Sequence, residues 1–168
     1  MASYDIGKAE VASWIREHFD LDARILDVGA GDGKWSIILP EYNDMDACEI
    51  FPPNAEKIKG FYKDTFCCDI DDLQYQKGRY DLIIFGDVIE HMTVEKAQRV
   101  LKYARTRCKD MIIAVPWLYQ QGELYGNRYE EHIQNDLTPE LFEERYPGYE
   151  AIYKADNYCY YHKKRARK

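Results

Sequence analysis

The chain has 168 residues, 46% of them hydrophobic, and a formal net charge of −7. This length and composition predict a single globular domain over residues 1–168, and the negative charge argues against bulk binding of nucleic acid. No apolar run approaches the roughly 18 residues of a membrane span, and the charged segment 1–20 differs from a signal peptide, so we expect a cytoplasmic protein without membrane contact.

Strands and helices alternate along the chain, which predicts a mostly parallel sheet with helices on both faces. Pro52 and Pro53 suit the start of a helix, and Thr93 suits a helix cap. The apolar run 80–85 is typical of a buried central strand. We expect helices over 5–19, 34–39, 52–60 and 94–107, and strands over 24–28, 46–50, 65–68, 80–85 and 111–115.

The C-terminal part departs from this alternation. Segment 116–136 shows no regular pattern, and a loop of this length in a small domain is more often functional than idle. A helix is expected over 138–145, and strands over 149–154 and 158–162 form a predicted hairpin. The fold class is therefore α/β, a doubly wound sheet of about seven strands with an antiparallel C-terminal hairpin.

Segment 25–34 reads Ile-Leu-Asp-Val-Gly-Ala-Gly-Asp-Gly-Lys, so a predicted strand ends in three glycines spaced two apart. Glycine allows bare backbone to approach a ligand closely, and ligands of open α/β sheets bind at the carboxyl ends of the strands. The later strands deliver Glu49, Asp69 and Asp87 to the same edge. A carboxylate there can accept both hydroxyls of a ribose. Together with Asp27, these acids suit a nucleoside with a positive charge.

Phosphate-containing cofactors fit this segment less well. The third glycine falls at Gly33, one residue earlier than the dinucleotide fingerprint requires, and the P-loop spacing is absent. The carboxylate of Asp27 would also repel a pyrophosphate.

These motifs, taken in order, resemble the class I S-adenosylmethionine-dependent methyltransferases in their small single-domain form. The resemblance implies a Rossmann-like fold with a reversed last strand, and S-adenosylmethionine as cofactor with S-adenosylhomocysteine as product. It implies that Asp27 and the glycines hold the methionine part, Glu49 the ribose and Asp69 the adenine amino group. The full set implied to bind the cofactor is Asp27, Gly29, Ala30, Gly31, Gly33, Glu49, Ile50, Asp69, Ile70, Asp87 and Val88.

Methyl transfer from a sulfonium mainly needs donor and acceptor to be aligned, and a general base helps only when the acceptor carries a proton. His91 and His132 are the candidate bases. The alternatives are that His91 packs or caps a helix, and that His132 bonds a backbone carbonyl. The adjacent residues Glu130, Glu131 and His132 do not converge well, so no metal site is predicted. The loop is expected to bind the acceptor through Trp117, Tyr119, Tyr125, Arg128 and Tyr129.

The expected function is methyl transfer to an oxygen or nitrogen of a small-molecule acceptor, by a monomer or homodimer. Segment 163–168 carries five positive charges; it is either a solvated terminus or a contact to an anionic partner. Two alternatives therefore stay open: a nucleic-acid or protein methyltransferase that uses this basic tail, and a cofactor-binding module without transfer activity. The five cysteines form no C-x-x-C pair, so reduced, buried thiols are expected.

Overall fold

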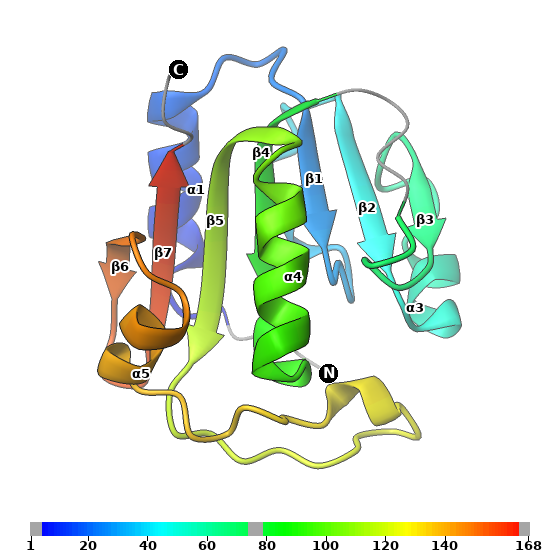
Figure 1. Cartoon of the computed structure of the whole chain (residues 1–168). Helices are drawn as coiled ribbons and strands as arrows, with labels where there is room; N and C mark the ends of the chain where they lie inside the picture. The colour runs from blue at the N-terminus through cyan, green and yellow to red at the C-terminus, as the bar shows by residue number, and fades with distance from the viewer. Residues whose placement is uncertain (1–4, 74–78, 165–168) are drawn as a thin grey trace.

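A computed structural model describes residues 5–73 and 79–164, and in it seven strands form one sheet with the order β3-β2-β1-β4-β5-β7-β6 (Figure 1). Five strands are parallel, whereas β7 runs antiparallel to β5 and to β6. This confirms the predicted doubly wound sheet with its antiparallel hairpin. The strands are β1 (Ile25–Val28), β2 (Met45–Glu49), β3 (Thr65–Cys67), β4 (Tyr80–Gly86), β5 (Cys108–Pro116), β6 (Glu150–Lys154) and β7 (Tyr158–Lys164).

Helices cover both faces of the sheet, as predicted (Figure 1). On one face lie α4 (Val94–Ala104) and α5 (Pro139–Arg145), and on the other α1 (Lys8–His18), α2 (Lys34–Ile38) and α3 (Pro52–Lys57). Successive residues of β1 and β4 point to opposite faces, so Leu26 and Phe85 join the core beneath α4, while Ile25 and Ile84 join the core beneath α1. The central strands are thus buried on both sides.

Every predicted helix and strand is present, and the differences lie at the ends. The strand expected over 111–115 begins at Cys108, because β5 pairs with β4 and β7 beyond its apolar centre. The helix expected over 52–60 ends at Lys57, and the one expected over 94–107 ends at Ala104. Thr93 caps α4 as predicted, since its side chain accepts a hydrogen bond from the Lys96 amide at 3.3 Å.

The loop 116–136 is irregular, as expected, apart from Pro116, which ends β5, and the short helix η2 (Arg128–Glu130). In Figure 1 it passes beneath the carboxyl ends of the parallel strands. Hydrogen bonds tie it to η1 (Ile89–His91), a short helix after β4 that was not predicted. The amides of Ile133 and Gln134 donate to the carbonyl of Glu90 at 2.8 and 2.9 Å. The loop is therefore fastened over the edge of the sheet where the predicted ligand residues lie.

The prediction that all the thiols are buried is wrong for Cys67, which is exposed, and for Cys68, which is half-buried. Both lie at or just after β3, an edge strand of the sheet, where one side of the chain has no neighbouring strand to cover it. Lys163 and Lys164 of the basic tail belong to β7, and residues 165–168 lie outside the described part. Among the described helices, none has the length and apolar character needed to cross a membrane.

Candidate active site

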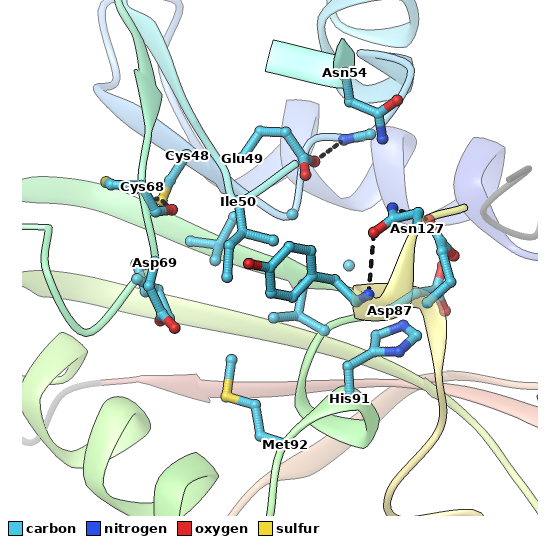
Figure 2. Close-up of a pocket in the computed structure, with 18 of the residues that line it drawn as sticks. Cys48, Glu49, Ile50, Asn54, Cys68, Asp69, Asp87, His91, Met92 and Asn127 are labelled. Atoms are coloured by element: carbon cyan, nitrogen blue, oxygen red, sulfur yellow. Dashed lines mark hydrogen bonds between the residues drawn. The ribbon is translucent and has the colours of Figure 1, made fainter. Parts of the chain in front are cut away.

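A pocket lies at the carboxyl ends of β1 and β4, the point at which the strand order reverses (Figure 2). This is where open α/β sheets bind ligands. Its wall is built from the strand ends, from η1 and from the loop. Most of the predicted cofactor residues line it, namely Gly29, Gly31, Glu49, Ile50, Asp69, Ile70, Asp87 and Val88.

The other predicted cofactor residues, Asp27, Ala30 and Gly33, do not line this pocket. Asp27 is buried within β1, and its carboxylate accepts a hydrogen bond from the hydroxyl of Tyr62 at 2.5 Å. Gly33 begins α2, and its amide donates to the carbonyl of Ala30 at 2.8 Å. Ala30 and Gly33 are thus part of the glycine turn itself, and Asp27 lies in the strand that leads into it.

Positions 29 and 31 favour glycine, because Gly29 and Gly31 both have positive φ, at +70° and +53°. At Gly29 a Cβ atom would lie 2.4 Å from Cγ2 of Val88, well inside van der Waals contact. The turn therefore packs directly on the segment after β4, which closes this side of the pocket.

Glu49 is held at the end of β2 by two backbone donors, the amides of Gly31 and Phe51, each at 2.8 Å. Burial raises the pKa of Glu49, and these two hydrogen bonds oppose the rise. Each carboxylate oxygen can accept a further hydrogen bond, so Glu49 keeps the capacity to bind a pair of hydroxyls, as the sequence predicts.

Asp69 lies at the far side of the pocket, beside Lys96 of α4, whose Nζ is 2.6 Å from its Oδ2 (Figure 2). Burial alone would raise the pKa of Asp69, but the hydrogen bonds from Lys96 and from the Asp71 amide, together with the nearby positive charges, outweigh burial and lower the pKa. The sequence did not indicate Lys96, because this contact joins residues that are 27 positions apart in the chain and forms only when α4 packs on the sheet. The thiols of Cys48 and Cys68, with 3.9 Å between their sulfurs, line the same part of the wall.

Asp87 follows β4 with a φ of +57°, which is uncommon for a residue with a side chain. Its Oδ1 accepts a hydrogen bond from the hydroxyl of Tyr158, and its buried Oδ2 has no hydrogen-bond partner among the described residues. Burial raises the pKa of Asp87, and the positive charge of Lys8 opposes the rise. Lys8 is itself buried, with Nζ 5.2 Å from the centroid of the Trp35 ring.

The two candidate bases lie side by side, with 4.7 Å between the ring centroids of His91 and His132. His91 lines the pocket, whereas His132 lies behind it. Burial lowers the pKa of His91, and burial together with the neighbouring His91 lowers the pKa of His132 to about 4. Both rings are therefore neutral at pH 7. The hydrogen bond to a backbone carbonyl that was the alternative role for His132 is present, to Tyr119 at 2.9 Å.

Of the loop residues predicted to bind the acceptor, only Tyr129 lines the pocket. Tyr125 is 89% exposed, and Arg128 donates to the hydroxyl of Tyr129 at the surface. Tyr119 packs its ring on His132, with 5.4 Å between centroids. Trp117 lies on a different groove, beside Pro139 and Lys154.

The loop contributes two pocket residues that sequence reasoning missed, Asn127 and Glu130. The side chain of Asn127 caps η2 by accepting from the Tyr129 amide at 3.0 Å (Figure 2). Asn54 and Met92, from α3 and from the end of η1, complete the wall. A polar residue in an irregular segment carries no periodic signal, so the sequence does not predict which way its side chain points.

Comparison with known proteins gives one family and a common fold. A family model described as a methyltransferase domain matches residues 7–135. N-terminal Xaa-Pro-Lys N-methyltransferase 1 from Danio rerio is 29% identical over 90 residues, which are 48% of this chain and 40% of that protein. Its counterpart 1-A from Xenopus laevis is 29% identical over 93 residues, 50% of this chain and 42% of that protein. The match therefore spans less than half of either relative.

Among solved structures, an S-adenosylmethionine-dependent methyltransferase from Clostridium acetobutylicum superposes with a TM-score of 0.70 at 14% identity, covering 98% of this chain and 92% of that one. Magnesium protoporphyrin IX methyltransferase from Synechocystis, with bound S-adenosylmethionine, superposes with a TM-score of 0.67 at 15% identity, covering 94% and 77%. At such identities the likeness shows the fold. With the family match over residues 7–135 and the pocket at the switch point, it follows that the chain belongs to the class I S-adenosylmethionine-dependent methyltransferases.

Proposed function

We propose that this protein transfers the methyl group of S-adenosylmethionine to a small-molecule acceptor that enters beside His91. The observation that carries the proposal is the lining of the pocket, which combines acidic strand ends with Asn127, Tyr129 and Glu130 of the fastened loop. A concave pocket with a few convergent polar groups is typical of a small-molecule site.

The residues around the pocket fit a cationic nucleoside. Glu49 would accept the ribose hydroxyls. The carboxylates of Asp69 and Asp87 also line the cavity, with Asp69 in an ion pair with Lys96. When bound, S-adenosylmethionine supplies an electrophilic methyl group on a positively charged sulfur. The protein's own part is to align an acceptor lone pair with that methyl carbon and to exclude water.

A second candidate function is methylation of a protein N-terminus, because the curated relatives bear the name of N-terminal Xaa-Pro-Lys N-methyltransferases. Asp87, Glu90 and Glu130 near the acceptor side would attract a cationic amine. The match to those relatives ends well short of their full length, so this acceptor ranks second.

Calorimetric titration with S-adenosylmethionine and S-adenosylhomocysteine tests the shared premise. Replacing Glu49 by Gln removes a charged acceptor and should weaken cofactor binding by about tenfold or more, since hydrogen bonds to charged groups contribute about 1.5–3 kcal/mol. The matched control is Glu56→Gln, because Glu56 is exposed and bonds only Lys59 among the described residues. Equal affinity in both variants would contradict the assignment of Glu49.

Incorporation of a labelled methyl group distinguishes a small-molecule acceptor from a protein N-terminus. We expect label in a small-molecule fraction of a cell extract, and none in peptides that begin with Xaa-Pro-Lys. A deletion confined to residues 165–168 tests the polyanion alternative without shortening β7, which includes Lys163 and Lys164. Loss of activity on that deletion, with a steep salt dependence, would favour an anionic polymer instead.

A further inference from the structure

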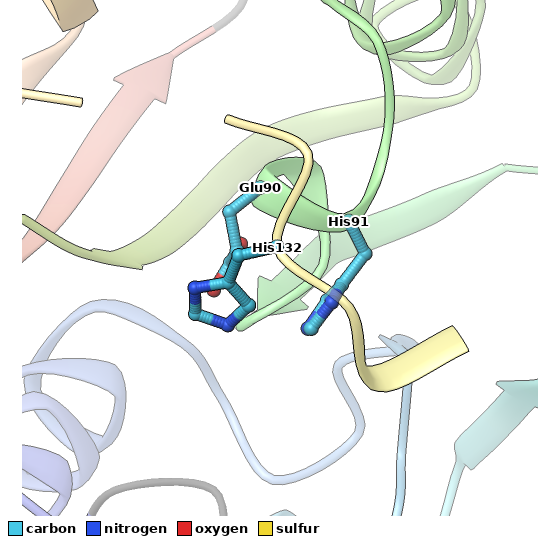
Figure 3. A group of neighbouring side chains, drawn as sticks. All are labelled: Glu90, His91 and His132. Carbon is cyan, nitrogen blue, oxygen red and sulfur yellow. The ribbon is translucent and has the colours of Figure 1, made fainter. Parts of the chain in front are cut away.

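Three potential metal ligands meet at the acceptor side of the pocket. Glu90 and His91 come from η1 after β4, and His132 comes from the loop, about 40 residues later in the chain (Figure 3). One ligand atom of each lies within 4.8 Å of the others. Ligand atoms bound to one ion at about 2.1 Å lie up to about 4.2 Å apart, so a shift of less than an ångström would bring them onto a common ion.

The carboxyl group of Glu90 has the surroundings expected of a cation ligand. Its residue is 0% exposed, and neither of its oxygens has a hydrogen-bond partner within the described part of the chain. A buried carboxyl group without partners costs several kcal/mol relative to a paired one. No described lysine or arginine forms an ion pair with it. A bound cation would supply the missing partner.

Each histidine has one ring nitrogen beside a backbone carbonyl of the loop. Nδ1 of His91 lies 3.0 Å from the carbonyl oxygen of Glu131, and Nδ1 of His132 lies 2.9 Å from that of Tyr119. Because a carbonyl only accepts, Nδ1 carries the proton in each neutral ring, and Nε2 keeps its lone pair. Metal-binding histidines are oriented in the same way, by donating their other N–H to a carbonyl or carboxylate.

Asp87 adds a further oxygen at this end of the pocket. Its Oδ2 is buried and also lacks a described partner, while Tyr158 holds Oδ1. Its uncommon backbone conformation, with φ at +57°, fits a position constrained by function.

We propose that Glu90, His91 and His132 bind a divalent transition-metal ion, such as Mn²⁺, Fe²⁺, Co²⁺ or Zn²⁺, beside the cofactor pocket. Two imidazoles and one carboxylate suit these ions, whereas Mg²⁺ and Ca²⁺ prefer oxygen ligands alone. Three protein ligands also leave coordination positions open for another molecule.

On the proposed methyl-transfer function, the open positions favour an acceptor that carries a hydroxyl group. A metal ion lowers the pKa of a hydroxyl that it binds, so the hydroxyl proton leaves to water. The oxygen then forms a bond to the methyl carbon, the carbon–sulfur bond breaks, and the electron pair stays on sulfur in S-adenosylhomocysteine. A metal-bound hydroxyl group as acceptor means O-methylation rather than N-methylation.

The test uses untagged full-length protein stripped with a chelator and then titrated with Mn²⁺, Co²⁺, Zn²⁺ and Mg²⁺ by calorimetry. We expect one transition-metal ion to bind per chain, with Mg²⁺ much weaker. Glu90→Gln and His132→Asn should each weaken binding by more than about tenfold. The control Glu131→Gln makes the same chemical change on an exposed neighbour and should leave affinity unchanged. The absorption spectrum of bound Co²⁺ should change in the first two variants only.

Three results would overturn this inference: no ion bound by the wild type, metal affinity in Glu90→Gln and His132→Asn that equals that of the wild type, or Mg²⁺ bound as tightly as Mn²⁺. Thermal unfolding without metal shows whether each variant folds. Glu90→Gln replaces a buried carboxyl group that has no described hydrogen-bond partner by an amide of the same shape, and should fold about as stably. A separate titration with S-adenosylhomocysteine tests the proposed function independently of the metal site. Binding of S-adenosylhomocysteine without any metal binding refutes the metal site alone, whereas metal binding without cofactor binding refutes the proposed function.

Discussion

At the scale of single residues, Asp27 is unusual in placing a carboxyl group inside the sheet. Burial raises its pKa to about 7, while the hydrogen bond from Tyr62 and the charge of Lys8 oppose the rise and the charge of Glu49 adds to it. The ordinary value of 3.8 applies to the unfolded chain. Between these two values the folded protein binds a proton that the unfolded chain has released.

This difference sets the sign of a pH dependence. A raised carboxyl pKa stabilises the fold at low pH, and that contribution is lost as the pH rises from about 4 to about 7. We predict that the free energy of unfolding of the wild type, relative to Asp27→Asn, falls across this window by up to about 1.4 kcal/mol per pH unit and stays constant above it.

Urea unfolding at a series of pH values measures this difference. The control is Asp22→Asn, since Asp22 is an exposed residue just before β1. A flat difference for Asp27→Asn between pH 4 and 7 would mean that Asp27 is ionised in the folded protein throughout.

At the scale of elements, the loop 116–136 decides how the pocket is closed. Gln134 is its main anchor. Its buried amide donates to the carbonyls of Ile89 at 2.7 Å and Met92 at 3.0 Å, and its oxygen accepts from the hydroxyl of Tyr146 at 2.9 Å. One side chain thus joins the loop to η1 and to the end of α5.

Removing this anchor should destabilise the fold and loosen the loop. We predict that Gln134→Ala lowers the free energy of unfolding by about 2–4 kcal/mol, because three buried polar groups lose a partner. Amide hydrogen exchange should speed up in the loop and in η1 more than in β4. Gln120→Ala, the same change at an exposed position of this loop, should leave both measurements unchanged; a similar loss of stability there would show that the effect is not specific to the anchor.

At the scale of the whole molecule, the cofactor pocket joins β1, β2, β4, η1 and the loop, so ligand binding should stabilise the entire domain. At 100 times its dissociation constant, S-adenosylhomocysteine adds about 2.7 kcal/mol. For a domain of this size we expect the midpoint of thermal unfolding to rise by roughly 5–10 °C. ATP at the same concentration should produce no such shift, because acidic side chains surround the pocket. A comparable shift with ATP would argue for a phosphate site.

Much of the fold was predictable from the sequence. The buried run of β4, the prolines at the start of α3 and the cap at Thr93 each act through local geometry, and each element appears where it was expected. The predicted ligand residues on strand ends also line the pocket for the most part, because parallel strands must bring their carboxyl ends to one edge.

The loop was the part that local patterns did not predict. Trp117, Tyr119 and Tyr125 were grouped as acceptor residues because they are aromatic and close in sequence, yet the structure places them on separate surfaces. An irregular segment has no period to say which way a side chain points. The acceptor roles of all five residues, Trp117, Tyr119, Tyr125, Arg128 and Tyr129, stay predictions.

The sequence by itself determined the fold class, because hydrophobic periodicity specifies strands and helices. The glycine turn and the strand-end acids indicated a cationic nucleoside, and their resemblance to a known family indicated S-adenosylmethionine as the cofactor. Only the tertiary structure decided which side chains meet across long separations. Lys8 reaches the carboxylates beneath the pocket, and His132 comes to lie beside His91 and Glu90. Those contacts depend on how a helix and an irregular loop pack against the sheet, and packing is set by the whole folded chain.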